Sequence, residues 1–200
     1  MRTPAEVALA VIEALEAHGI PYALGGAQAL SYWGTVRNTV DADVLASIPA
    51  IRYQELADAL NEQDFVMERE GQEVPVDVPT MRAEERSRHL FRVFLEGIKA
   101  EIFIPAFSLQ HEILRRAIRC PLHGREVLVT TAEDLILLKM IFHRRKDLDD
   151  VRGILWHQQG NLDFVYLAGW AIRVLEPAVA KELEQLVAEY TSPNASPGEG

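Results

Sequence analysis

The sequence is poor in cysteine, since Cys120 is the only one in 200 residues. A single thiol excludes an internal disulfide, and no cluster of cysteine and histidine has the spacing of a zinc site. We interpret Cys120 as a small apolar packing residue rather than a reactive thiol. The sequence also lacks an apolar run near the roughly 18 residues that cross a bilayer, and its N-terminal segment is amphipathic. We therefore expect a cytoplasmic protein with no membrane partner.

Positive charge is scarce as well. The chain has 20 Lys and Arg against 30 Asp and Glu, a formal net charge of −10. Proteins that bind duplex DNA over a broad surface neutralise phosphates, so this balance argues against that class. Between residues 111 and 152 the balance reverses, with nine Lys and Arg against seven Asp and Glu. This stretch is suited to face a polyphosphate or an RNA end.

The length and the composition are those of an ordinary globular protein. Apolar residues make up 48% and charged residues 25%, and we find no internal repeat. A chain of this size holds one catalytic domain with a helical extension. We expect a core at residues 1–130, a C-terminal helical part at 131–190 packed on it, and a disordered tail rich in Ser, Pro and Gly at 191–200.

Apolar periodicity predicts most of the secondary structure. In the strand predicted at 98–104, alternation places Lys99, Glu101 and Phe103 on one face, so a strand of the buried type carries an isolated acid. Residues 65–88 break the pattern with Gly71, Pro75 and Pro79, and we expect an irregular insertion or lid there. Helices are predicted at 4–18, 27–33, 49–63, 109–116, 146–159 and 163–190 and from Ala132 behind a Thr131 cap, and strands at 20–24, 40–45, 90–95, 98–104, 118–122 and 126–129.

Two glycines and a spaced pair of aspartates carry the strongest functional signal. Gly25 and Gly26 follow a short apolar strand, and the helix expected after them turns its first N–H groups toward a ligand. Asp41 and Asp43 stand at i and i+2 of the next strand, where side chains share a face about 7 Å apart. Carboxylates at that separation grip one divalent ion or straddle two. We therefore expect the N–H groups that bind an anion and the carboxylates that bind a cation to lie close together.

The stretch from Gly25 to Val44, GGAQALSYWGTVRNTVDADV, resembles the nucleotidyltransferases of the DNA polymerase beta superfamily. More narrowly, it is similar to the small bacterial group of type IV toxin (AbiEii-like) and minimal nucleotidyltransferases. The resemblance implies an α/β (α+β) nucleotidyltransferase fold, a mixed twisted sheet flanked by helices. It also implies two Mg²⁺ ions, replaceable by Mn²⁺, and an NTP as substrate.

The resemblance further assigns roles to individual residues. Asp41, Asp43 and a third carboxylate on a neighbouring strand, here Glu101 where aspartate is more usual, would be the catalytic residues and the metal ligands. The nucleotide-binding residues implied by the resemblance are Gly25, Gly26, Arg37, Thr39, Lys139 and Asp147. Arg37 and Thr39 either contact phosphate or stabilise the turn before the aspartates.

A distal segment, residues 133–152, resembles the AbiEii-like motif in which a lysine on one helix and an aspartate opening the next complete the nucleotide site. Lys139 lies among Leu, Ile, Met and Phe, where an unpaired charge is costly, so it needs an anionic partner. That partner is either a triphosphate or Asp147. If the helix continued unbroken, Lys139, His143, Lys146 and Asp150 would share one face. These residues either contact the substrate directly or form an ion-pair network that holds two helices together.

These motifs support two hypotheses of different classes. The first is a metal-dependent transfer of a nucleoside monophosphate from an NTP to a hydroxyl of RNA, protein or a small molecule, with tRNA or an antitoxin partner relevant if the protein is a toxin. The second is an inactive nucleotidyltransferase-fold protein that senses nucleotides or binds a partner, favoured by Glu101 and by one extra residue between Gly26 and Asp41. A third, aminoglycoside or lincosamide transfer, needs a further acid such as Asp77 or Glu133.

Overall fold

The computed structural model describes residues 2–34 and 36–191. The tail predicted to be disordered lies, from residue 192 on, outside the described residues. The chain divides into two compact units, a first unit of residues 1–28 and 38–130 and a second unit of residues 29–37 and 131–200. The second unit thus includes the segment at residues 29–37, and the predicted division of the chain at residue 131 stays a prediction. No helix among the described residues has the length and apolar character needed to span a membrane.

The first unit is built on a mixed sheet, which has eight strands within the described residues. Its spatial order is β4-β3-β5-β6-β2-β1-β8-β7, in which β2 pairs with β6 and β1 with β8 in parallel and the other neighbours are antiparallel. The strands are β1 (Tyr22–Leu24), β2 (Asp41–Ala46), β3 (Val66–Arg69), β4 (Gln72–Pro75), β5 (Leu90–Leu95), β6 (Ile98–Phe103), β7 (Ile118–Leu122) and β8 (Arg125–Val129).

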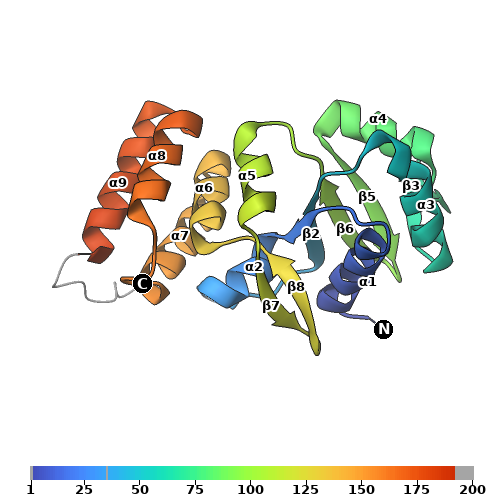
Figure 1. Ribbon diagram of the computed structural model, residues 1–200, viewed down its shortest axis with the longest axis horizontal. Coiled ribbons are helices and arrows are strands. Elements are labelled where there is room, and N and C mark those ends of the chain that lie inside the picture. Colours follow the sequence, from blue (N-terminus) through green and yellow to red (C-terminus); the bar gives the residue numbers. More distant parts are fainter. Residues whose placement is uncertain (1, 35, 192–200) are drawn as a thin grey trace. The chain divides into compact units, whose positions relative to one another are not determined.

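The central strands β2 and β6 carry apolar side chains on one face and charged side chains on the other. In β2 and β6 the alternate residues Ala42, Val44, Ala100 and Ile102 are completely buried. Helix α1 (Pro4–Ala17) lies against the sheet (Figure 1) and contacts both strands. Its own apolar stripe, which includes Val7, is buried. The acidic residues predicted for the site therefore lie on the other face, as period two requires.

The helices of the first unit lie close to their predicted positions, and α1 has a complete N-terminal cap. Thr3 and Glu6 make a reciprocal capping box at the start of α1. The helix predicted from Pro49 begins instead as a short 3₁₀ turn, Ala50–Arg52, before α3 (Tyr53–Glu62). Helix α5 (Ser108–Arg116) and the two hairpins at 90–103 and 118–129 occur where they were predicted.

The irregular lid expected at 65–88 is wrong, because this region is a hairpin followed by a helix. Glu70 and Gly71 both take left-handed φ values, 54° and 77°, which form a tight turn between β3 and β4. Pro75 ends the edge strand β4, where no ladder donor is missed. Asp77 caps α4 (Val78–Arg88) by accepting from the Thr80 N–H at 2.8 Å, with Pro79 in the first turn. Both prolines thus occupy positions that regular structure tolerates.

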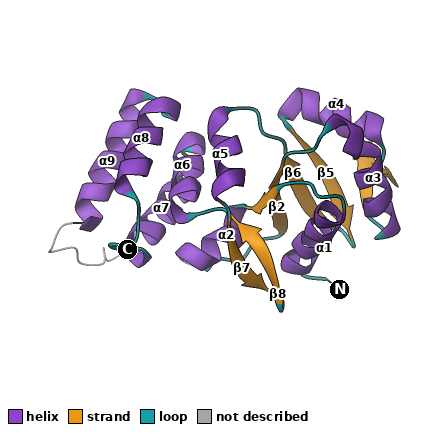
Figure 2. Cartoon of the chain, in the orientation of Figure 1, coloured by secondary structure: helices purple, strands orange, loops and turns teal. Residues whose placement is uncertain are grey.

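The described part of the second unit contains helices and no strand (Figure 2). Thr131 caps α6 as predicted, accepting from the Asp134 N–H. Two helices form here, as predicted from Ala132 and at 146–159, because His143 ends α6 with a left-handed φ of 51°. The helix predicted at 163–190 is interrupted before Pro177. The helices are α6 (Ala132–Phe142), α7 (Arg145–His157), α8 (Phe164–Val174) and α9 (Pro177–Thr191), while α2 (Gly26–Trp33) starts in the first unit and ends in the second.

One side chain fixes the chain between β4 and α4. The Asn61 amide donates to the Val76 carbonyl and accepts from the Val76 N–H, both at 2.8 Å, so it satisfies two backbone groups of a buried residue. Asn61→Ala should lower the free energy of unfolding by about 1–3 kcal/mol, because it leaves these groups unpaired. Chemical denaturation measures this, with the exposed Gln54→Ala on the same helix as a control. Equal stabilities of the two variants would contradict the prediction.

Candidate functional site

The parallel register of β2 and β6 brings the predicted acids together. Asp43 pairs with Glu101, and Asp41 pairs with Lys99. Residues paired across two strands point to the same side, so Asp41, Asp43 and Glu101 lie on one face. Their side chains are partly buried and still open to solvent, since that of Asp41 is 30% exposed and that of Glu101 is 17% exposed. The face that carries them is therefore accessible to a ligand.

The glycine corner lies directly beside Asp43. The Gly25 N–H donates to the Asp43 carbonyl at 2.8 Å, which extends the pairing of β1 with β2 by one bond. Gly26 has a φ of 58°, and a Cβ built there would come within 1.8 Å of the Asp43 Oδ2. Only glycine fits this position, because the backbone conformation and the close carboxylate both exclude a side chain. The Asp43 carboxylate thus lies against the N-terminus of α2, where a helix favours negative charge.

Thr39 orients Asp41 at the start of β2. Its hydroxyl donates to the Asp41 carboxylate at 2.8 Å. Burial opposes the charged form of Asp41, but the Thr39 hydroxyl and the Lys99 ammonium outweigh burial and hold the pKa of Asp41 below its usual range. Asp41 is therefore a carboxylate at neutral pH, and Thr39 holds it at the start of β2, while phosphate binding by Thr39 stays a prediction.

Two basic residues on this face were not predicted as site residues. The Lys99 Nζ lies 3.3 Å from the Asp41 Oδ2 and 3.1 Å from the Glu101 Oε1. The Arg92 Nε donates to the same Glu101 oxygen at 2.9 Å. Burial favours the neutral amine of Lys99, but Glu101 and Asp41 outweigh it and raise the pKa of Lys99. Alternation along 98–104 placed Lys99 beside Glu101, but its contact with Asp41 depends on the pairing of β2 with β6.

The donor set suits a hard divalent cation, although the ligands are not gathered around a common point. Among the described residues no three His, Cys, Asp or Glu side chains form a group that could hold a metal ion. Asp41 and Glu101 nevertheless both contact one cation, the Lys99 ammonium. Carboxylate oxygens are also the ligands that Mg²⁺ prefers. Metal binding by Asp41, Asp43 and Glu101 stays a prediction.

Comparisons with known proteins show the fold. No protein-family model and no curated protein matches the chain. Among solved structures, the solution structure of the antibiotic-resistance factor ANT(2'')-Ia is 15% identical, covers 92% of this chain and 89% of its own, and gives a TM-score of 0.50. The chain has the nucleotidyltransferase fold. At this identity, the likeness speaks for the fold alone.

Other solved structures give similar scores. A crystal structure of ANT(2'')-Ia in complex with adenylyl-2''-tobramycin is 16% identical, with 93% and 95% of the two chains covered and a TM-score of 0.49. A nucleotidyltransferase-like protein from Paracoccidioides brasiliensis is 17% identical, with 90% and 91% covered and a TM-score of 0.48. Within this nucleotidyltransferase fold, the glycine corner and the acids of β2 and β6 are parts of the first unit.

Three other predicted site residues, Arg37, Lys139 and Asp147, belong to the second unit of the nucleotidyltransferase fold. The buried Lys139 Nζ lies 2.5 Å from the Asp150 Oδ2 and 3.8 Å from the Asp147 Oδ1. Arg37 contacts the other Asp150 oxygen at 3.3 Å, and Arg144 contacts Asp147 at 2.6 Å. The charge of Lys139 is thus paired by aspartates, with Asp150 as the closer partner. Its binding to a nucleotide stays a prediction.

The acids considered as additional bases have structural partners. Asp77 caps α4 through the Thr80 N–H and hydroxyl, both at 2.8 Å. Glu133 is buried and accepts from the Asp163 N–H at 2.9 Å, which links the start of α8 to the start of α6. Both carboxylates therefore satisfy backbone groups at helix ends.

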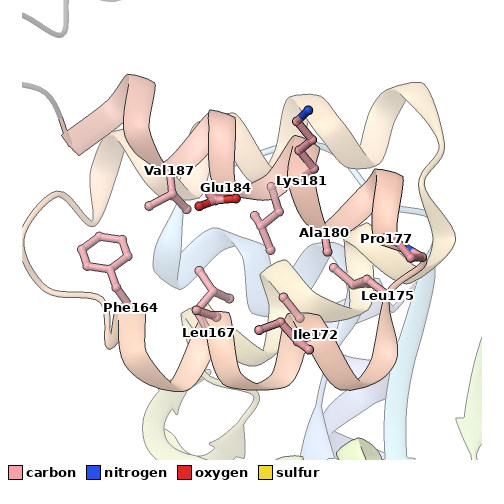
Figure 3. Close-up of a pocket in the computed structure, with 12 residues that line it drawn as sticks. Phe164, Leu167, Ile172, Leu175, Pro177, Ala180, Lys181, Glu184 and Val187 are labelled. Atoms are coloured by element: carbon pink, nitrogen blue, oxygen red, sulfur yellow. The ribbon is translucent and has the colours of Figure 1, made fainter.

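The second unit contains a cavity of about 630 Å³ between α8 and α9. Phe164, Leu167 and Ile172 of α8 face Val187 of α9 across it (Figure 3). Its lining is apolar apart from Lys181 and Glu184 and contains none of the predicted site residues. Such a lining does not suit a metal ion or a triphosphate.

Gly26→Ala tests the contact between the glycine corner and Asp43. The substitution should lower the free energy of unfolding by about 1–3 kcal/mol more than Gly97→Ala, because the added methyl overlaps a carboxylate. Gly97 is the matched control, since its φ is also positive, at 77°, and a Cβ there meets nothing within 4 Å. Urea denaturation of the two variants measures the difference. Equal losses would show that Asp43 does not occupy the observed position.

The ion pairs of Asp147 make stability depend on pH. Burial favours its protonated form, but Arg144 and Lys139 outweigh burial and hold the pKa of Asp147 below its ordinary value of 3.8. A folded-state pKa below the unfolded value gives stability that is complete above pH 3.8 and is lost as the pH falls through the folded pKa.

We expect Asp147→Asn to destabilise the protein at pH 7 and to lie closer to wild type below pH 3.8. Unfolding followed by circular dichroism from pH 7 to pH 2.5 measures the gap between the two proteins. Asp149→Asn is the control on the same helix, because the side chain of Asp149 is 66% exposed. A gap for Asp147→Asn that stays constant with pH would refute the assigned cause.

Proposed function

We propose that this protein is a metal-dependent nucleotidyltransferase, which moves a nucleoside monophosphate from an NTP to a hydroxyl acceptor and releases pyrophosphate. The observation that carries the proposal is the pairing of Asp43 with Glu101 beside the Gly25–Gly26 corner. It places three carboxylates on one accessible face, next to a helix N-terminus that favours an anion.

Each residue of this face has a role in the proposed reaction. The backbone at Gly25 and Gly26 would lie against the β- and γ-phosphates, because neither residue has a side chain of its own and the N-terminus of α2 favours an anion. Asp41, held by Thr39, and Asp43 would be shared cation ligands. Glu101 would complete the ligand set and accept the proton of the attacking hydroxyl. Bound divalent cations would supply charge neutralisation at the α-phosphate and at the leaving pyrophosphate.

Glu101 is one methylene longer than the aspartate usual in the resembled group, so its carboxylate needs additional support. Arg92 provides it, because the two residues are paired across β5 and β6 and bonded at 2.9 Å. A fixed glutamate reaches the position of a shorter acid without losing its orientation. We therefore take Glu101 as a working member of the site.

The proposed roles of residues in the second unit depend on a rearrangement of their ion pairs. Arg37, Lys139 and Asp147 would contact the nucleotide if Asp150 released Lys139 and Arg37. The subgroup proposed is the AbiEii-like one, because the motif order and the distal lysine and aspartate resemble it. This makes tRNA and a partner protein the first acceptors to test, and a cognate antitoxin would act as the regulator.

The proposal predicts nucleotide transfer that depends on the two aspartates. Wild-type protein incubated with each α-³²P-labelled NTP, MgCl₂ and tRNA, protein or aminoglycoside acceptors should label one acceptor. Asp41→Ala combined with Asp43→Ala should reduce labelling by about a thousandfold, because metal ions contribute several kcal/mol to such transition states.

Asp58→Ala combined with Asp149→Ala is the control, since it also removes two aspartates, both exposed. Equal labelling by wild type and the double variant of Asp41 and Asp43 would overturn the assignment. Nucleotide binding by calorimetry without label on any acceptor would indicate instead a protein that senses nucleotides.

A further inference from the structure

The Lys99 ammonium lies between two of the proposed metal ligands, Asp41 and Glu101. Its Nζ is 3.3 Å from the Asp41 Oδ2 and 3.1 Å from the Glu101 Oε1. The position is set by the backbone, because Lys99 is paired with Asp41 across β2 and β6 and stands two residues before Glu101 on the same face. Its side chain is only 32% exposed. The ammonium is thus held between the carboxylates rather than extended into solvent.

The charges on this face are nearly balanced without any metal ion. Asp41, Asp43 and Glu101 carry three negative charges, and Lys99 and Arg92 carry two positive ones, which leaves one net negative charge among the five. An ammonium within about 3 Å of a ligand oxygen repels a second cation strongly at the effective dielectric of a protein surface. A divalent cation therefore meets weak attraction while Lys99 stays in place.

We propose that Lys99 is a tethered cation, which occupies the space between Asp41 and Glu101 in the nucleotide-free protein and must be displaced before a divalent cation binds there. The inference rests on the proposed function, since it takes these two carboxylates as metal ligands. A triphosphate, with about four negative charges at neutral pH, offers the displaced ammonium a new partner. Metal and nucleotide would then enter the site together.

A purely structural role for Lys99 makes a different prediction. If the lysine only holds β2 and β6 together, its removal lowers stability and leaves metal affinity unchanged or weaker. If it is a tethered cation, its removal raises metal affinity, because two ligands lose a competing charge. Metal affinity therefore separates the two roles, and activity is not needed to do so.

The test titrates nucleotide-free protein with MnCl₂ by isothermal calorimetry and by the electron paramagnetic resonance signal of free Mn²⁺. Lys99→Met should bind Mn²⁺ about tenfold more tightly than wild type, and Lys99→Arg should not. Lys99→Gln, which keeps a polar end, serves if circular dichroism shows that Lys99→Met is unfolded. Lys146→Met is the control, because it removes one exposed lysine from the second unit and leaves the net charge equal to that of Lys99→Met.

Adding Asp41→Asn to Lys99→Met should abolish the gain in affinity. A gain that persists with Asp41→Asn, or one equal to that of Lys146→Met, would overturn the inference because the metal would then bind elsewhere. Equal Mn²⁺ affinity of wild type and Lys99→Met would also overturn it, while leaving the carboxylates as a metal site. If no folded variant binds Mn²⁺, the inference fails, and the labelling experiment decides separately whether nucleotide transfer occurs.

Discussion

The in-register parallel pairing of β2 with β6 is the constraint on which the proposed site depends. Pairing of Asp43 with Glu101 fixes which side chains share a face, and a shift by one residue would turn one strand's charged set into the apolar core. The register is held by burial, because the alternate residues of both strands are completely buried and α1 packs on them. The apolar residues that alternate with the acids therefore determine on which face the acids lie.

The acids on this face carry like charges, and basic residues of neighbouring strands offset those charges. Lys99 comes from β6 and Arg92 from β5, while the N-terminus of α2 lies beside Asp43. Without these opposite charges, carboxylates on one face would repel one another and favour protonation. In the proposed site, the same cations would also compete with an incoming metal ion. If the proposal holds, the side chains that stabilise this face would also weaken its affinity for metal.

The second unit also pairs opposite charges, but there the charged side chains are buried. Lys139, Asp147 and Asp150 lie almost fully buried, and each charge has an opposite partner. Breaking such a group is costly, because it leaves an unpaired charge in a region of low dielectric. The sequence showed that Lys139 required an anion, since its neighbours along α6 are apolar. The sequence did not show which aspartate pairs with Lys139, because α6 ends at His143 and the aspartates lie on a separate helix, α7.

Local patterns in the sequence determined most elements, the Thr3 and Thr131 caps and the sharing of one face by Asp41 and Asp43, since these depend on residues a few positions apart. They failed at 65–88, where Gly71, Pro75 and Pro79 were taken as breakers although a turn, a strand end and a first helical turn accommodate them. Only the tertiary structure decided that β6 lies beside β2, that Lys99 contacts Asp41, and that residues 29–37 join the C-terminal helices. These contacts join residues far apart in the chain, and their register is set by the burial of whole strands rather than by any local preference.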